Sequence, residues 1–232
     1  MRLAVMQPYF FPYVGYFALA ATCDRFVFYD DVGYIKNGWI NRNRILLGRE
    51  PAYITVPLLN ASASKRIDEV TIANAQPWKR KMLESVRHGY ANAPYFEPVD
   101  ALVRSVLDAQ DDRIAELAKS SVRAVCDYLE VATDFVASPA GYGNSQLRGA
   151  ERVKDICTRE AATEYWNLPG GRDLYAESDF ASAGLALRFV QVDATPYPQF
   201  SSSFQPFLSI IDVLMHNAPA QVREMVAAGR GS

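Results

Sequence analysis

The chain has 232 residues, of which 50% are hydrophobic and 22% are charged, with a formal net charge of -2. This composition can fill a sizeable globular core and excludes a disordered, collagen-like or coiled-coil chain. The near balance of charge argues against a dedicated nucleic-acid binder, which normally carries a basic face.

The first thirty residues carry the pattern of a βαβ unit. Residues 3–6 form a short apolar run that is typical of a buried parallel strand, and a proline-aromatic loop follows at residues 8–12. A helix is predicted over residues 13–22 and a second strand over residues 26–29. The sequence therefore predicts a parallel sheet with a crossover connection.

The middle of the chain predicts two more strands and then a long helical region. The strands are predicted at residues 39–47 and 53–58. Apolar residues recur at helical spacing over residues 78–130, with one break near Pro94 and another around residues 111–112. We therefore predict three helices in residues 78–130, which form an insert packed on the core.

The second half of the chain returns to the alternation of strands and helices. Further strands are predicted at residues 134–137, 162–166 and 187–192, and helices at residues 151–160, 206–216 and 218–228. The whole pattern predicts one α/β domain over residues 1–232, with a parallel Rossmann-like sheet, a helical insert and C-terminal helices.

The sequence also indicates a cytoplasmic protein. The apolar run at the N-terminus is too short for a signal peptide, and no apolar stretch approaches the roughly 18 residues needed to span a bilayer. The three cysteines, Cys23, Cys126 and Cys157, are odd in number and far apart, which favours reduced thiols over a disulfide framework or a zinc site.

Polar residues follow the first two predicted strands. Gln7 ends the first strand, and Asp30 and Asp31 end the second. In an open parallel sheet, ligands bind outside the carboxyl ends of the strands, so these side chains are expected to face one crevice. Either carboxylate there can act as a base, hold a hydroxyl group or bind a hard cation. The alternative is that one aspartate only caps a turn.

The loop between the first strand and the helix is unusually aromatic. Residues 8–16 hold five aromatic residues and two prolines. A surface loop of this kind is expected to pack against a ligand, a lid or the core, and Gly15 allows a close approach to the backbone. The residues predicted to bind substrate here are Tyr9, Tyr13, Gly15 and Tyr16. The alternative for Phe10 and Phe11 is that they pack into the core.

Basic and amide side chains are interleaved in residues 34–44, just beyond the aspartate pair. Such a mixture suits a phosphate, a carboxylate or a sugar nucleotide. If the segment is a strand, alternation places Arg42 and Arg44 on one face and Trp39 on the other. The candidate residues are Lys36, Trp39, Asn41, Arg42 and Asn43. The alternative is a solvated run of charge.

A glycine pair, Gly170 and Gly171, follows a predicted strand and is a second candidate loop, although an ordinary turn explains it equally well. The two histidines, His88 and His216, lie on predicted helices without a partner in the sequence. No Ser-His-Asp or Cys-His arrangement is visible, and no metal site is predicted. The sequence identifies no particular cofactor.

Three segments together resemble the signature of the WbqC-like family. They run from Gln7 to Phe17, from Phe28 to Val32 and from Lys36 to Asn43, and the likeness continues through residues 55–58, the glycine pair and residues 204–212. Members of that family are encoded among bacterial genes for O-antigen and related surface sugars. A glycine (aminoacyl) transferase role has been suggested for them.

The arrangement is also similar, more distantly, to nucleotidylyltransferases of the HIGH superfamily. Tyr13-Val14-Gly15-Tyr16 stands where those enzymes begin a helix with His-x-Gly-His. This resemblance implies a nucleotidyltransferase-like sheet. Tyrosine in place of each histidine puts the adenylylation chemistry in doubt, because a neutral phenol stabilises a transferring nucleotidyl group less well than a histidine does.

The leading hypothesis is a transferase that joins an aminoacyl, possibly glycyl, or acyl group to an activated sugar in surface polysaccharide or secondary-metabolite biosynthesis. On this hypothesis Asp30 or Asp31 is the general base, and Lys36 and Arg42 hold an anionic part of a sugar nucleotide or acyl donor. The alternatives are a nucleotidylyltransferase-like enzyme and a non-catalytic small-molecule-binding protein. A homo-oligomer and a carrier-protein partner stay open.

Overall fold

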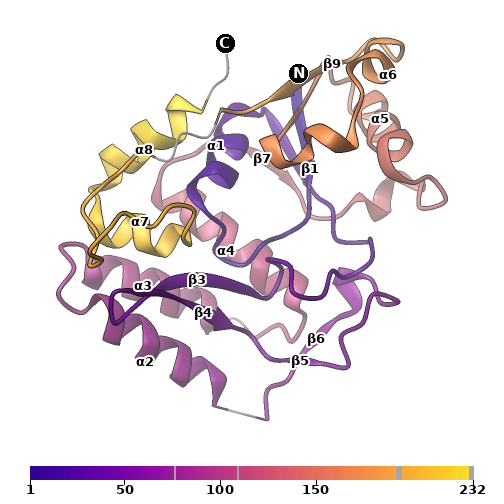
Figure 1. Cartoon of the computed structure of the whole chain (residues 1–232). Coiled ribbons are helices and arrows are strands. Elements are labelled where there is room, and N and C mark those ends of the chain that lie inside the picture. The colour runs from indigo at the N-terminus through magenta and orange to yellow at the C-terminus, as the bar shows by residue number, and fades with distance from the viewer. Residues whose placement is uncertain (76, 109, 192–194, 230–232) are drawn as a thin grey trace.

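The computed structural model describes residues 1–75, 77–108, 110–191 and 195–229. Within these residues the centre is a parallel sheet of five strands in the order β7-β2-β1-β8-β9 (Figure 1). The strands are β1 (Arg2–Met6), β2 (Arg25–Phe28), β7 (Asp134–Val136), β8 (Glu164–Asn167) and β9 (Ala186–Phe189). Helices flank the sheet, so the predicted Rossmann-like α/β core is confirmed.

Strand β1 lies in the middle of the sheet and is buried on both faces. Leu3, Ala4 and Val5 are all buried, which explains why the segment reads as a continuous apolar run rather than an alternating one. The strand pairs in parallel with β2 on one side and with β8 on the other. Helix α1 (Val14–Thr22) connects β1 to β2, so the predicted βαβ unit is confirmed.

The two faces of the sheet pack into two separate hydrophobic cores. Leu3 and Val27 point to one core together with Val153, whereas Ala4 and Phe26 point to the other. This split follows from the alternation of side chains along a strand. One face is covered by α5 (Gly149–Arg159) and α6 (Glu177–Ala181), and the other by α1, α4 (Ile114–Tyr128) and α8 (Pro219–Ala228).

The segment after β2 forms an antiparallel hairpin, which lies below the parallel sheet in Figure 1. Its strands are β3 (Arg42–Leu47) and β4 (Glu50–Thr55), joined by a two-residue turn in which Gly48 and Arg49 both have positive φ. The predicted strand start at residue 39 is wrong. Residues 38–41 bend instead, because the Trp39 carbonyl accepts a hydrogen bond from the backbone N–H of Phe10.

Two further short strands complete this lower part of the molecule. They are β5 (Leu58–Leu59) and β6 (Thr71–Ile72), which pair in antiparallel fashion. The predicted strand over residues 53–58 is therefore divided between β4 and β5. Val56 and Pro57 lie in neither strand, and Pro57 has no N–H to donate to a ladder.

The three predicted helices in residues 78–130 are present as α2 (Trp78–Tyr90), α3 (Phe96–Leu107) and α4. In α2, the buried side chains Trp78, Met82, Val86 and Tyr90 recur every four residues and form one apolar stripe. Helix α3 packs between α2 and α4. The description of this region as a distinct insert stays a prediction.

The C-terminal part differs from the sequence prediction at its boundaries. The predicted strand over residues 187–192 ends at Phe189, and residue 192 lies outside the described residues. The helix predicted over residues 206–216 begins later, as α7 (Ile210–His216), because Phe207 has a φ of 57° and Ser209 caps the helix by accepting a hydrogen bond from Ile211. No helix in the described ranges is long and apolar enough to cross a bilayer.

Candidate functional site

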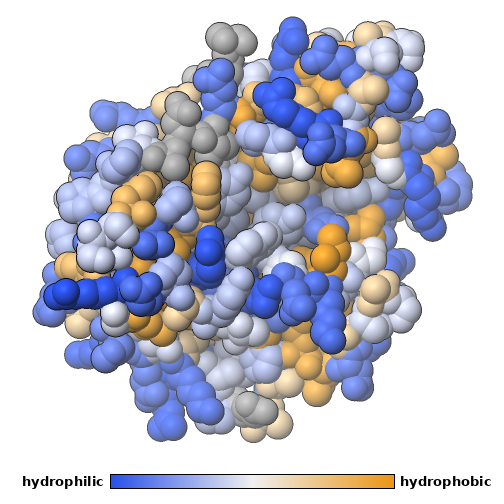
Figure 2. Space-filling view, in the orientation of Figure 1, coloured by the Kyte–Doolittle hydropathy of each residue, from blue (hydrophilic) through white to orange (hydrophobic). Residues whose placement is uncertain are grey.

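A pocket of about 570 Å³ opens at the carboxyl ends of β1, β2 and β8. Gln7 follows β1, Tyr29 follows β2 and Asn167 ends β8, and all three line it. The chain runs from β1 outward to β2 and β7, and then returns to the other side as β8 and β9. The pocket therefore lies at the switch point of the strand order, where open α/β sheets bind ligands. Figure 2, drawn in the orientation of Figure 1, shows a hollow near the centre of the surface that faces the viewer.

The aromatic loop is held in place from three directions. Phe10 and Phe11 are fully buried in the core, as the alternative for these two residues predicted. The backbone N–H of Phe11 donates to the Ser121 hydroxyl at 2.9 Å, and the Phe11 carbonyl accepts from Asn43 at 2.7 Å and from Ser209 at 2.8 Å. These bonds hold Phe11 at a φ of 40°, a value that a non-glycine residue adopts only when its surroundings enforce it.

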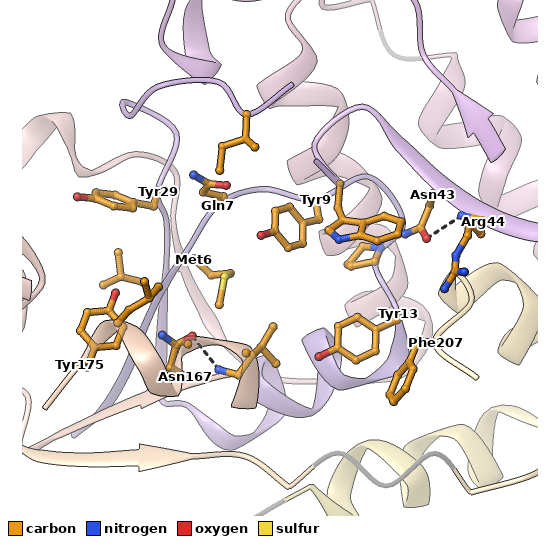
Figure 3. A pocket seen from close by; sticks show the side chains of 18 residues that line it. Met6, Gln7, Tyr9, Tyr13, Tyr29, Asn43, Arg44, Asn167, Tyr175 and Phe207 are labelled. Atoms are coloured by element: carbon orange, nitrogen blue, oxygen red, sulfur yellow. Dashed lines mark hydrogen bonds between the residues drawn. The ribbon is translucent and has the colours of Figure 1, made fainter. Parts of the chain in front are cut away.

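Two tyrosines of this loop, Tyr9 and Tyr13, form one side of the pocket (Figure 3). The Tyr13 ring lies 5.9 Å from the ring of Phe207, which lines the pocket from the C-terminal part of the chain. Burial, together with the nearby Tyr9, raises the pKa of Tyr13 to about 12. Tyr13 is therefore a neutral phenol at physiological pH, able to donate a hydrogen bond.

The other two predicted residues of the loop lie outside the pocket lining. Tyr16 is fully buried, and its hydroxyl donates to the Gln7 carbonyl at 2.9 Å, so it holds the backbone at the end of β1. Gly15 lines a separate cavity of about 90 Å³ beside α8, which Phe207 also borders.

The two aspartates are engaged in buried ion pairs. Asp30 accepts from the Lys119 ammonium group at 2.5 Å and from the Ser138 hydroxyl at 2.5 Å. Asp31 accepts from the Arg152 guanidinium at 2.5 Å. Neither aspartate lines the pocket. Their assignment as catalytic bases stays a prediction.

Asp31 reaches the pocket indirectly through Arg152. The guanidinium carbon of Arg152 lies 5.1 Å from the centre of the Tyr29 ring, and its Nε donates to Asn144 at 3.0 Å. Burial raises the pKa of Tyr29, and the Arg152 charge opposes that rise. The Asp31–Arg152 pair therefore lies behind a pocket-lining phenol.

The basic segment contributes Trp39 and Asn43 to the pocket, but not the cations predicted there. Lys36 is exposed in a turn outside the pocket lining. Arg42 donates to the carbonyls of Asn37 and Gly38 and so fixes the turn before Trp39. Asn41 also has a structural partner on each side, since it accepts from the Tyr34 hydroxyl at 2.9 Å and donates to the Val56 carbonyl at 2.8 Å.

Arg44 is the cation that does line the pocket. It lies two residues beyond Arg42 on β3, and the bend over residues 38–41 brings the Trp39 ring to 5.9 Å from its guanidinium carbon. The sequence predicts both arginines on one face and favours Arg42, whereas Arg44 is the one that lines the pocket.

Both predicted glycines line the pocket, next to Asn167. A Cβ atom added to Gly171 would lie 2.6 Å from Nδ2 of Asn167, so only glycine leaves room for that amide. The Oδ1 of Asn167 accepts from the backbone N–H of Leu168 at 2.7 Å, which fixes the orientation of the side chain. The rule that polar residues at strand ends face the crevice would have found Asn167, but the strand was predicted to end at residue 166.

Several lining residues were missed, some within the segments singled out from the sequence and others, such as Leu174 and Tyr175, outside them. They are Val5, Met6, Pro12, Tyr29, Ile35, Arg44, Asn167, Leu168, Leu174, Tyr175 and Phe207. In the described part of the chain, the titratable groups of the lining are Arg44 and four tyrosines, and no group of three His, Cys, Asp or Glu residues is placed to hold a metal ion. The pocket can therefore stack rings, hydrogen-bond hydroxyls and attract one anionic group.

Comparisons with known proteins agree with the resemblance seen in the sequence. A family model described as the WbqC-like protein family matches residues 7–224. A protein of Mycobacterium tuberculosis (strain ATCC 25618 / H37Rv), the uncharacterized protein Rv1507c, is 30% identical over 218 residues, which cover 93% of each chain. No solved structure matches the chain. The chain belongs to the WbqC-like protein family.

Proposed function

We propose that this protein is a biosynthetic transferase that binds an activated sugar or a related small molecule in the switch-point pocket and joins it to an aminoacyl or acyl group. The observation that carries the proposal is the pocket itself. Its volume of about 570 Å³ falls in the range of small-molecule sites, and it occupies the position at which α/β sheets bind their ligands.

The lining is suited to a sugar or another ring with hydroxyl groups. Tyr9, Tyr13 and Trp39 offer aromatic faces on which the apolar face of a ring can pack. Gln7 and Asn167 bring amides that both donate and accept hydrogen bonds, which a hydroxyl group requires.

The border of the pocket suits a second, more apolar substrate. Ile35, Leu174 and Phe207 line the pocket and yet are more than half exposed. Large apolar side chains left exposed around a pocket are typical of a surface that another molecule covers. This supports an acyl donor, free or attached to a carrier, that reaches the sugar from the pocket mouth.

The transfer requires an acceptor hydroxyl or amine to attack the donor carbonyl and lose its proton, while the leaving group departs with a proton. Tyr29 is the pocket phenol with a cation behind it, and in this proposal it hydrogen-bonds the reacting oxygen. Asp31 then acts as a positioning residue through Arg152 rather than by touching the substrate.

One observation favours a second candidate, a binding protein without turnover. Within the described residues, the pocket lining contains no carboxylate, histidine, lysine or cysteine that would serve as a conventional base or nucleophile. This candidate predicts ligand binding without product.

Thermal unfolding against sugar nucleotides, acyl-coenzyme A species and glycine tests the proposal. A ligand at 100 times its dissociation constant stabilises the fold by about 2.7 kcal/mol, or roughly 5–11 °C for a chain of this size. Trp39→Ala should abolish the shift. Phe200→Ala is the matched control, because Phe200 is 38% exposed against 37% for Trp39 but lies outside the pocket lining.

Mass spectrometry of the incubated substrates separates the two candidates. A sugar that gains the mass of an acyl group from an acyl-coenzyme A, with release of the free thiol, supports the transferase, whereas free glycine serves only as a binding probe because its carboxylate carries no leaving group. A thermal shift without any mass change supports the binding protein. No shift with any of these compounds would contradict both.

A further inference from the structure

Arg44 is a cation in the pocket wall whose guanidinium has no ion-pair or hydrogen-bond partner among the described residues. Arg44 is the one permanently charged side chain among the described residues that line the pocket. Its guanidinium makes no ion pair or hydrogen bond with the described residues, and its Nε is buried without a partner. A buried donor left unpaired costs about 1–3 kcal/mol, so native proteins rarely keep one without a reason.

The backbone of Arg44 is nevertheless firmly fixed. Its N–H donates to the Asn43 side chain at 2.8 Å, and its carbonyl accepts from the backbone N–H of Ser209 at 2.8 Å. The residue also pairs with Tyr53 across the hairpin. Figure 3 shows the guanidinium at the end of the pocket near Asn43 and Phe207. The guanidinium therefore lacks a polar partner within the described residues even though the backbone that carries it is fixed.

Two other arginines near the pocket have polar partners within the protein. Arg42 donates to two backbone carbonyls, and its guanidinium carbon lies 4.4 Å from the centre of the Tyr53 ring. Arg152 is buried and pairs with Asp31. Arg44 has the Trp39 ring beside it, but its guanidinium has no ion-pair or hydrogen-bond partner within the described residues.

We propose that Arg44 binds the anionic group of the ligand, a phosphate or a carboxylate. A guanidinium presents parallel N–H groups that match either anion in a two-point contact. At the opposite end of the pocket in Figure 3, Tyr29, Tyr175 and Asn167 are polar but uncharged. The pocket then takes a ligand with an anionic group at one end and an uncharged, hydroxyl-bearing ring at the other. This inference rests on the proposed use of the pocket as the substrate site.

Calorimetric titration with four probes tests the inference: glucose, glucose 1-phosphate, glucuronate and inorganic phosphate. The wild type should bind an anionic hexose more tightly than glucose, and the two anionic hexoses distinguish a phosphate site from a carboxylate site. Arg44→Gln should weaken anion binding roughly 10- to 100-fold, the loss of a charge-assisted hydrogen bond, and leave glucose binding unchanged. The affinity of Arg44→Lys for the anionic hexoses should lie between that of the wild type and that of Arg44→Gln.

The control is Arg80→Ala, which removes one positive charge from an exposed i,i+4 pair on α2. Circular dichroism and the melting temperature establish that each variant is folded. If Arg44→Gln weakens the binding of glucose and of glucose 1-phosphate by the same factor, this inference is overturned while the proposed function stands. The same holds if Arg42→Gln loses as much anion binding as Arg44→Gln does. A wild type that binds none of the four probes would overturn this inference, and it would overturn the proposed function as well only if sugar nucleotides and acyl-coenzyme A species also give no thermal shift.

Discussion

The buried pair of Asp31 and Arg152 gives the sharpest test of how this fold is held together. Arg152 is 1% exposed and Asp31 is 8% exposed, and their charged groups meet at 2.5 Å. The pair joins α5 to the end of β2 beneath the pocket-lining Tyr29. Arg152→Met keeps most of the side-chain volume and removes the charge, which leaves the Asp31 carboxylate in a low-dielectric site without a counter-charge.

The expected cost is large. Removing one partner of a buried ion pair destabilises a protein by about 3–5 kcal/mol, because the remaining charge loses both its hydration and its partner. For a chain of this length, each kcal/mol lowers the melting temperature by about 2–4 °C, so we expect a fall of roughly 6–20 °C. The double variant Asp31→Leu with Arg152→Met should recover most of this loss, since an apolar pair of similar volume can replace a buried ion pair.

Urea unfolding followed by circular dichroism measures these free energies. The matched control is Arg159→Met on the same helix, which breaks an exposed i,i+4 pair with Asp155 and should cost less than about 1 kcal/mol. If Arg152→Met costs no more than Arg159→Met, the structural account of this pair is refuted. If Asp31→Asn keeps both full stability and full turnover, Asp31 is neither the base that the sequence suggested nor a positioning residue.

Three further predictions follow from single side chains. Gly171→Ala should displace the Asn167 amide, which costs about 1–3 kcal/mol of folding stability and weakens ligand binding. An unchanged affinity by calorimetry would contradict the role of that amide. Burial raises the pKa of Cys126 and of Cys157 to about 12, so a thiol reagent at pH 8 should label neither thiol before the protein unfolds. Rapid labelling of either thiol in the native protein would contradict their burial. Burial lowers the pKa of His216 in the folded protein. The stability that the neutral imidazole contributes is therefore present above the unfolded pKa of about 6.5 and is lost as pH falls through the lower, folded pKa. His216→Gln should flatten this part of the pH–stability curve, and an unaltered curve would disprove the role of His216.

The central part of the fold was predictable because its signals are local. The unbroken apolar run of β1, the prolines at positions 8 and 12 and the second apolar run at β2 define a βαβ unit without reference to the rest of the chain. The strand-end rule then placed Gln7 correctly beside the crevice. Element boundaries were less predictable where a tertiary contact decides them, as in the bend before β3.

The same rule selected Asp30 and Asp31 and missed Tyr29, because it locates the end of a strand but not the direction of each side chain. After β2, Tyr29 faces the pocket, while the two carboxylates meet cations from α4 and α5. Those cations lie about a hundred residues further along the chain, and nothing near the aspartates in the sequence announces them.

Arg42 and Arg44 show why the sequence alone could not identify the pocket cation. On an ideal strand from residue 39 the two side chains share one face, and the pattern of charged residues does not distinguish them. In the fold, the carbonyls of Asn37 and Gly38 accept hydrogen bonds from Arg42, whereas Arg44 has a fixed backbone and no polar partner for its guanidinium among the described residues. An arginine held in place with unused hydrogen-bonding capacity is a better indicator of a binding site than its place in a basic segment, and only the packed structure reveals which arginine that is.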